Sequence, residues 1–218
     1  KAPRIVAGRD TQASGERILG ALVDGFRRAG GTMLDFDVVP TPAVATLVRE
    51  EEADLGIAIT ASHNPSADNG IKFFSGEGTK FSESEEARIE AFLLEPAPVA
   101  ASPEPEFSLT RREGSARYLR TAEILSRHLD LRGTKIVCDT ASGGTCGTTP
   151  KALEALGAKV IRLGDRPDGE NINRDCGSEH PERMAERVRS EGATVGVAHD
   201  GDGDRAVFSD AEGDLVPG

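Results

Sequence analysis

Along nearly all of this chain, short apolar runs of strand length alternate with longer segments whose apolar residues recur at helical spacing. The predicted strands cover residues 4–8, 33–39, 54–60, 70–74, 135–138, 159–163, 195–199 and 206–209. The predicted helices cover residues 14–29, 42–52, 82–94, 112–131, 150–156 and 181–191. Such alternation is typical of α/β domains, in which helices cover the faces of a largely parallel sheet. We therefore predict an α/β fold.

A proline-rich segment divides the chain. Residues 95–105 contain four prolines and three alanines, a composition typical of a linker. We expect a first domain over residues 1–95, a linker over 96–110 and a second domain over 111–218. Each predicted domain is long enough to bury a core of its own.

The two halves of the sequence look alike. Residues 53–58 match residues 193–198, and Phe73, Glu77 and Gly78 match Phe208, Glu212 and Gly213 in the same register. This similarity predicts an internal duplication. In that register the polar loop that contains Ser62 corresponds to residues 199–205, so each half presents one polar loop after an equivalent strand. Open α/β sheets bind ligands at this end of their strands, and we expect the two domains to share one cleft.

Composition limits the classes of partner. The 37 acidic and 26 basic residues give a net charge of −11, which disfavours nucleic acid and anionic membrane surfaces. A phosphorylated substrate would need local positive charge. No apolar stretch approaches the roughly 20 residues that span a bilayer. The three cysteines lack metal-site and C-x-x-C spacing, so we expect reduced thiols in a cytoplasmic protein.

Asp200, Asp202 and Asp204 alternate with glycines directly after a predicted buried strand. Carboxylates this close together repel unless a cation or a base neutralises them, and oxygen ligands of this kind suit Mg²⁺. The alternative interpretation is a solvated acidic turn, which would be favoured if the sequence contained only a D-x-D pair. An EF-hand is excluded, because its sixth and twelfth loop positions would be Arg205 and Ala211. The pattern favours a magnesium site.

Ser62 follows another predicted strand and allows two interpretations. A serine in such a turn often bonds only to the local backbone. An acyl-transfer triad is poorly supported, because the surrounding sequence lacks the G-x-S-x-G pattern. Phosphoryl transfer fits better, since it needs a hydroxyl, a cation and a group that moves the proton. His63 is a candidate for handling the proton or orienting the loop, and Lys72 for a cation or acid.

Three stretches together resemble one enzyme family. They are Thr-Ala-Ser-His-Asn-Pro at 60–65, Asp-Asn-Gly-Ile-Lys-Phe-Phe at 68–74 and Asp-Gly-Asp-Gly-Asp-Arg at 200–205. In this order they closely resemble the motifs of the α-D-phosphohexomutases. The chain is most similar to the bacterial phosphoglucosamine mutase branch. The stretches that carry this resemblance are residues 68–74, Gly8–Thr11 with Ser14-Gly15, and Asn171–Asn173 followed by Cys176–Ser178. Enzymes of that branch interconvert glucosamine 6-phosphate and glucosamine 1-phosphate on the route to cell-wall precursors.

The resemblance implies two related three-layer α/β/α domains with mixed sheets, from a family with four domains. It implies a phosphoserine at Ser62 and Mg²⁺ held by that phosphoserine together with Asp200, Asp202 and Asp204. By the same resemblance, the remaining site residues are His63 beside the serine, Lys72 and Arg205 lining the site, and Arg9 supporting the cleft. A salt bridge to Asp10 or another nearby carboxylate is an equally weighted interpretation of Arg9. The phosphoryl group would pass to a sugar phosphate through a hexose 1,6-bisphosphate, which also serves as activator.

The resemblance covers most of the first two family domains only. The leading segment with its active-site arginine, the sugar-recognising third domain and the phosphate-clamping fourth domain have no counterpart here. We therefore expect this polypeptide alone to bind Mg²⁺ weakly and to lack mutase turnover. The resemblance leaves a homodimer open.

Other functions stand beside this one. A phosphoglucomutase or phosphomannomutase of the same family is the first alternative, because the sugar-selecting loop belongs to the third domain. A phosphatase with an aspartyl nucleophile is a second, because the segment from His199 to Asp204 resembles the D-x-D loop of haloacid-dehalogenase-type enzymes. That interpretation leaves the Ser62 motif unexplained. The third is a non-catalytic remnant that binds a sugar phosphate.

Overall fold

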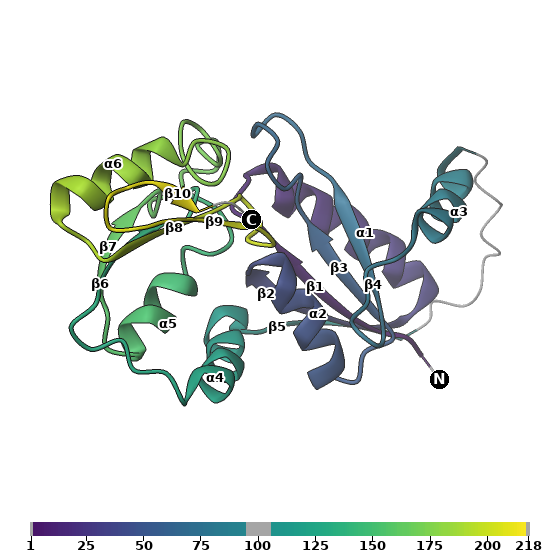
Figure 1. Cartoon of the computed structure of the whole chain (residues 1–218). Coiled ribbons are helices and arrows are strands. Elements are labelled where there is room, and N and C mark those ends of the chain that lie inside the picture. Colours follow the sequence, from purple (N-terminus) through teal and green to yellow (C-terminus); the bar gives the residue numbers. More distant parts are fainter. Residues whose placement is uncertain (1, 95–105, 217–218) are drawn as a thin grey trace.

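The chain forms two lobes, each built around its own five-stranded sheet (Figure 1). The computed structural model describes residues 2–94 and 106–216. The first sheet has the order β4-β3-β1-β2-β5, with β1 at Arg4–Arg9, β2 at Gly31–Val38, β3 at Leu55–Ile59, β4 at Ile71–Ser75 and β5 at Phe107–Arg111. The second has the order β10-β9-β8-β6-β7, with β6 at Lys135–Asp139, β7 at Lys159–Leu163, β8 at Val195–His199, β9 at Ala206–Ser209 and β10 at Leu215–Val216. The helices are α1 (Ser14–Ala29), α2 (Thr41–Glu50), α3 (Glu83–Leu94), α4 (Gly114–Ser126), α5 (Thr149–Ala155) and α6 (Glu182–Glu191).

In the first lobe, helices cover both faces of the sheet. Successive side chains of a strand point to opposite faces, so Ile5 and Val6 of β1 enter different cores. Ile5 packs with Leu19 of α1 on one face, and Val6 packs with Leu47 of α2 on the other. Helix α4 also packs on α2 and β2, which joins the second half of the chain to the first lobe.

The second lobe has the same three layers. Val137 of β6 packs with Met184 and Val188 of α6, and its neighbour Ile136 packs on the opposite face with Leu153 of α5. The first sheet has one antiparallel pair, β3–β4, and the second has two, β8–β9 and β9–β10. The other strand pairs of both sheets are parallel. The predicted pair of three-layer α/β/α domains with mixed sheets is therefore confirmed.

The duplication expected from the sequence is visible in the strand register. The order β4-β3-β1-β2 repeats as β9-β8-β6-β7. Ile57 pairs with Phe73 in the first sheet, and Val197 pairs with Phe208 in the second. Gly78 and Gly213 follow the returning strands with φ of +75° and +77°. These are the equivalences that the sequence comparison predicted.

The carboxyl end of the predicted linker forms a strand. Residues 107–110, assigned to the linker, form strand β5 with Arg111, parallel to β2 at the edge of the first sheet. Gly31 of β2 is opposite Phe107, so β5 supplies a backbone partner on the side of β2 that faces away from β1. Residues 96–105 of the expected linker lie outside the described part. The last predicted strand, residues 206–209, is β9, which pairs with β8 and β10.

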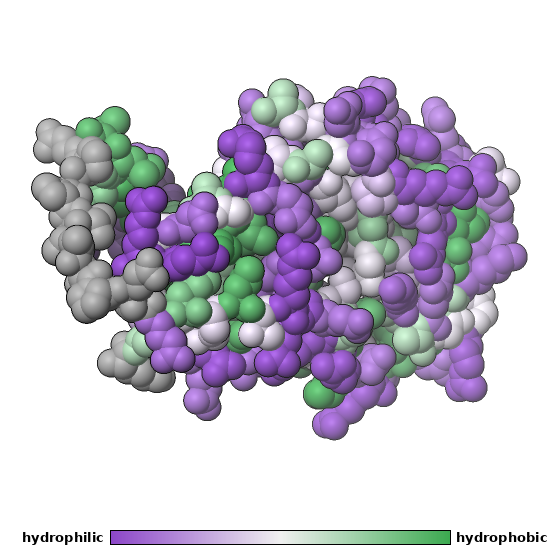
Figure 2. All heavy atoms as spheres, turned by 180° about the vertical axis from the view of Figure 1, so that it is seen from behind, coloured by the Kyte–Doolittle hydropathy of each residue, from purple (hydrophilic) through white to green (hydrophobic). Residues whose placement is uncertain are grey.

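Helix α3 differs from the other helices in having no buried residue. Its carboxyl end exposes Phe92, Leu93 and Leu94, seen as an apolar patch beside the grey segment in Figure 2. Among residues 2–94 and 106–216, no helix combines the length and apolar character needed to cross a membrane.

Candidate active site

The two polar loops occupy equivalent places in the two sheets and meet between the lobes. The serine loop, residues 60–70, connects β3 to β4, and the aspartate loop, residues 200–205, connects β8 to β9. The Ser62 hydroxyl oxygen lies 2.9 Å from Oδ2 of Asp200 and 3.1 Å from Oδ1 of Asp202. Residues that are more than 130 positions apart in the sequence thus share one site.

Ser62 is held in an unusual backbone conformation. Its φ is +57°, in the left-handed region that few residues other than glycine adopt. Its backbone N–H donates to Oγ1 of Thr60 at 2.9 Å. These features aim the side chain at the aspartate loop, and strained residues of this kind are concentrated at functional sites.

Lys72 brings a positive charge from the first lobe to the aspartate loop. Its Nζ donates to Oδ2 of Asp202 at 2.6 Å and to Oδ2 of Asp204 at 2.9 Å. Burial lowers the pKa of Lys72, but the hydrogen bonds and charges of these two carboxylates outweigh it and raise the pKa above its usual value. Lys72 is therefore charged at neutral pH and acts there as a donor.

The carboxylates of the aspartate loop differ in their surroundings. Burial, followed by the charge of Asp202, raises the pKa of Asp200. Burial also acts to raise the pKa of Asp202, but hydrogen bonds from Lys72 and Thr41 prevail and lower it. Asp200 and Asp202 are almost fully buried, at 0% and 1% exposed, so their charges need compensation.

The aspartate loop fits a small hard cation. Asp200, Asp202 and Asp204 each offer one oxygen, and these oxygens all lie within 4.8 Å of one another. Carboxylate oxygens are the ligands that Mg²⁺ and Ca²⁺ prefer, and Mg²⁺ commonly takes one or two of them together with phosphate oxygens. The Ser62 hydroxyl lies beside this cluster, where a phosphate on it could supply such an oxygen.

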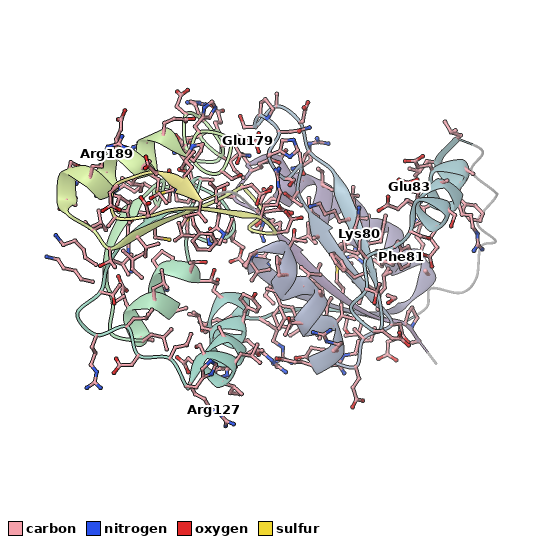
Figure 3. All side chains as sticks on the ribbon, in the orientation of Figure 1. Lys80, Phe81, Glu83, Arg127, Glu179 and Arg189 are labelled. Carbon is pink, nitrogen blue, oxygen red and sulfur yellow. The ribbon has the colours of Figure 1, made fainter. Side chains whose placement is uncertain are left out.

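Arg205 adds a second cation at the same loop. Its Nε lies 3.1 Å from Oδ2 of Asp200, and its Nη1 lies 3.2 Å from Oε1 of Glu179. Figure 3 labels Glu179 close to the junction of the lobes. The Arg205 side chain is 45% exposed, so part of its guanidinium faces solvent and is available to an anion.

Two of the predicted site residues do not contact this cluster. His63 is exposed, and within the described part of the chain its side chain makes no hydrogen bond. Arg9 pairs instead with Asp37 at 2.8 Å and with Glu16 at 2.5 Å. This arrangement matches the salt-bridge interpretation of Arg9, and a direct role for Arg9 stays a prediction.

Three further residues contact the site, and the sequence had indicated no role in the site for any of them. Thr41 at the start of α2 donates its hydroxyl to Oδ2 of Asp202 at 2.5 Å. The Asn173 amide donates to the backbone oxygens of Ser62 at 2.8 Å and of Asn64 at 3.1 Å. Asp10 lies beneath the serine loop, and burial raises its pKa to about 6.

Only weak sequence signals marked these residues. Thr41 directly precedes the predicted helix at residues 42–52, and Asp10 follows the predicted strand at residues 4–8. Asn173 belongs to one of the stretches that favoured a family branch. Nothing in the sequence indicated that Thr41 and Asn173 would reach across to the other domain.

Comparisons with known proteins agree with this architecture. Residues 1–98 match the family described as phosphoglucomutase/phosphomannomutase, alpha/beta/alpha domain I, and residues 116–213 match its domain II. A phosphoglucosamine mutase of Caulobacter vibrioides is 45% identical over 217 residues, which are 98% of this chain and 48% of that protein. The chain thus spans about half the length of the curated relatives it matches.

Solved structures show the same fold. A phosphoglucomutase/phosphomannomutase family protein from Burkholderia thailandensis superposes with a TM-score of 0.82 at 26% identity, over 98% of this chain and 48% of that one. An N-acetylphosphoglucosamine mutase of Aspergillus fumigatus, solved with GlcNAc-6P and magnesium, has a TM-score of 0.51 at 16% identity. It covers 95% of this chain and 34% of that chain, and at this identity the likeness concerns the fold alone.

Proposed function

The chain belongs to the phosphoglucomutase/phosphomannomutase family, and we propose that it forms the phosphoserine and cation half of a phosphoglucosamine mutase. The observation that carries this proposal is the position of the Ser62 hydroxyl, 2.9 Å and 3.1 Å from two carboxylates of the aspartate loop. Phosphoryl transfer depends mainly on positioning and on neutralising charge, and this site provides for both.

In the proposed reaction Ser62 carries the phosphoryl group. A sugar hydroxyl attacks the phosphorus, so the bond to Ser62 Oγ breaks and a bond to the sugar oxygen forms. The proton of the sugar hydroxyl passes to a base, for which His63 is the candidate. The departing Ser62 oxygen takes a proton from an acid, for which Lys72 is the candidate. The resulting hexose 1,6-bisphosphate turns over in the cleft and returns its other phosphate to Ser62, which also explains its role as activator.

The residues around Ser62 divide the remaining tasks. Asp200, Asp202 and Asp204 would hold Mg²⁺, which when bound neutralises charge on the transferring phosphoryl oxygens. Lys72 is charged and donates hydrogen bonds, so it can take over part of the serine phosphate's charge. Arg205, half exposed beside Asp200, is placed to receive the phosphate of the substrate.

The proposed sugar substrate is argued from sequence similarity. The 45% identity to a phosphoglucosamine mutase favours glucosamine phosphates over glucose and mannose phosphates. We propose that the parts of the parent protein beyond this chain supply sugar recognition and the phosphate clamp. The same proposal places the protein in the cytoplasm and predicts no mutase turnover by the 218-residue chain alone.

One assay series tests the proposal. The full-length parent is compared on glucosamine 1-phosphate, glucose 1-phosphate and mannose 1-phosphate, each with its bisphosphate as activator. We expect the highest kcat/KM on glucosamine 1-phosphate and, by intact mass, one phosphoryl group on the enzyme. A preference for glucose or mannose phosphate would reassign the substrate, and an active enzyme that is never phosphorylated would refute the serine mechanism.

A further inference from the structure

At the site, each lobe contributes a side chain that hydrogen-bonds to the reactive loop of the other lobe. Thr41 belongs to the first lobe and bonds to the aspartate loop of the second, while Asn173 belongs to the second lobe and bonds to the serine loop of the first. We propose that Thr41 and Asn173 are positioning residues, through which each lobe fixes the reactive loop of the other. This inference rests on the proposed function, because it concerns how that site is held in working geometry.

Thr41 fixes the orientation of the Asp202 carboxylate. Its hydroxyl binds Oδ2 at 2.5 Å, and its backbone N–H donates to the Asp202 carbonyl oxygen at 2.8 Å. Lys72 binds the same Oδ2 at 2.6 Å, which leaves Oδ1 directed toward Ser62 at 3.1 Å. Thr41 is 6% exposed and Asp202 is 1% exposed, so water does not compete strongly for these bonds.

Thr41 would hydrogen-bond to a carboxylate that itself holds the cation, and ligands of bound metals usually have such a second partner. Groups that hydrogen-bond to a ligating carboxylate hold it in one orientation, and their loss typically weakens metal affinity about 10–100-fold. Thr41 also stands at the amino end of α2, where the helix dipole favours a nearby negative charge. Both effects act on Asp202 from the opposite lobe.

Asn173 fixes the backbone of the serine loop. Its side-chain amide donates to the carbonyl oxygens of Ser62 and Asn64, on either side of His63. Asn173 has a φ of +58°, a conformation that asparagine tolerates better than most residues. With these carbonyls bound, the serine loop cannot turn Ser62 away without breaking two hydrogen bonds.

The aspartate loop makes room for this contact. A Cβ at Gly201 would lie 2.6 Å from the Ser62 carbonyl oxygen and 2.7 Å from the Asn173 amide nitrogen. The serine loop, Asn173 and the aspartate loop are therefore packed against one another at a single point. A displacement of one lobe relative to the other would disturb both halves of the site together.

Thr41 is tested by cation affinity in the 218-residue chain, with Mn²⁺ as a paramagnetic probe for the Mg²⁺ site. We expect Thr41→Val to weaken Mn²⁺ binding about tenfold or more, and Thr41→Ser to restore most of it. The matched control is Thr46→Val on the same helix, whose hydroxyl bonds only to the carbonyl of Pro42. Equal Mn²⁺ affinity in the Thr41→Val and Thr46→Val chains would overturn the role of Thr41.

Asn173 is tested by hydrogen exchange without any cation. We expect Asn173→Ala to speed the exchange of amides in residues 60–70 and to leave the β-sheet amides of both lobes unchanged. The control is Asn171→Ala, because the Asn171 amide bonds within its own loop, to the backbone of Arg166 and Asp168. Equal exchange of residues 60–70 in the two variants would overturn the role of Asn173.

The two readouts also separate this inference from the proposed function. If the wild-type chain binds no Mn²⁺, the proposed cation site fails. In that case amide hydrogen exchange in residues 200–205 tests the role of Thr41. We still expect faster exchange of these amides in Thr41→Val than in Thr46→Val. Thermal denaturation of each variant, with Tm close to wild type, excludes general unfolding as the cause.

Discussion

The serine loop and the aspartate loop occupy equivalent positions of a duplicated fold, but they differ in length and in burial. The aspartate loop needs only residues 200–205 to return from β8 to β9, and it is buried at Asp200, Gly201 and Asp202. The serine loop takes residues 60–70, and several of its side chains are exposed. The short loop fixes charges close to a strand end, whereas the long loop reaches across to the other lobe and is held there by partners.

The difference shows how duplication can yield two halves of one site. Both loops follow the carboxyl end of a buried parallel strand, where backbone groups and side chains converge. Charge compensation reaches the aspartate loop from the other sheet through Lys72, and backbone support reaches the serine loop through Asn173. Neither loop is complete in its own domain.

The largest expected effect comes from removing the hydroxyl that defines the serine loop. In the full-length parent, Ser62→Ala should abolish phosphorylation by a hexose 1,6-bisphosphate, because the loop then has no phosphoryl acceptor at the aspartate cluster. Intact-mass measurement gives the readout. Ser66→Ala, in the same loop, is the control and should keep one phosphate. A phosphate retained in Ser62→Ala would assign the acceptor to another residue, such as Asp200, and would revive the phosphatase alternative.

The aspartate loop should respond unequally to the loss of each charge. Asp202 is 1% exposed and bonds to Ser62, Thr41 and Lys72, whereas the Asp204 side chain is 37% exposed. We expect Asp202→Asn to weaken Mg²⁺ binding at least about 100-fold, and Asp204→Asn about tenfold. Isothermal titration calorimetry measures both. Equal losses would show that burial does not rank these ligands.

Local sequence patterns predicted many of the strands and helices that carry the two loops. Strands at residues 159–163, 195–199 and 206–209 and the helix at 14–29 have the bounds that the apolar patterns indicated. Local periodicity determines such elements, and equivalent strand ends place their loops at equivalent edges. The proximity of Ser62 to the aspartate loop also followed from the motifs, although the roles of the site residues stay predictions.

What the sequence did not reveal depends on contacts between distant residues. Strand β5 follows a proline-rich segment and pairs with β2, more than seventy positions earlier, so no local pattern marked its partner. Thr41 lies 161 positions from Asp202, and Asn173 lies 111 positions from Ser62. Their roles depend on how the two lobes dock, which no periodicity within one lobe determines.

A smaller effect concerns the charge beneath the serine loop. Burial raises the pKa of Asp10 from 3.8 to about 6, although hydrogen bonds from Thr60 and Gln12 act to lower it. The folded protein thus binds this proton more tightly than the unfolded chain, so stability should fall as the pH rises from about 4 to about 6. The shift corresponds to a loss of about 3 kcal/mol at neutral pH.

Asp10→Asn tests this contribution. Asparagine keeps an oxygen for the Gln12 N–H and carries no charge, so the variant should have a higher Tm than wild type at pH 7.5 and a similar Tm at pH 4. Calorimetry with a chelator present measures both without a bound cation. If the difference in Tm between Asp10→Asn and wild type were the same at both pH values, Asp10 would not titrate in this range. Its charge would then be compensated in the folded protein, as the charges of the aspartate loop are.

The smallest expected effect probes the point where the two loops touch. Gly201→Ala would place a methyl group 2.6 Å from the Ser62 carbonyl oxygen, and such overpacking costs about 1–3 kcal/mol. Gly20→Ala in α1 is the matched control, because a Cβ there meets nothing within 4 Å and alanine favours a helix by up to about 1 kcal/mol. We expect Tm to fall in the first variant and to rise slightly in the second. If both changes were harmless, the serine loop would not rest on the aspartate loop, and the two lobes would position their halves of the site independently.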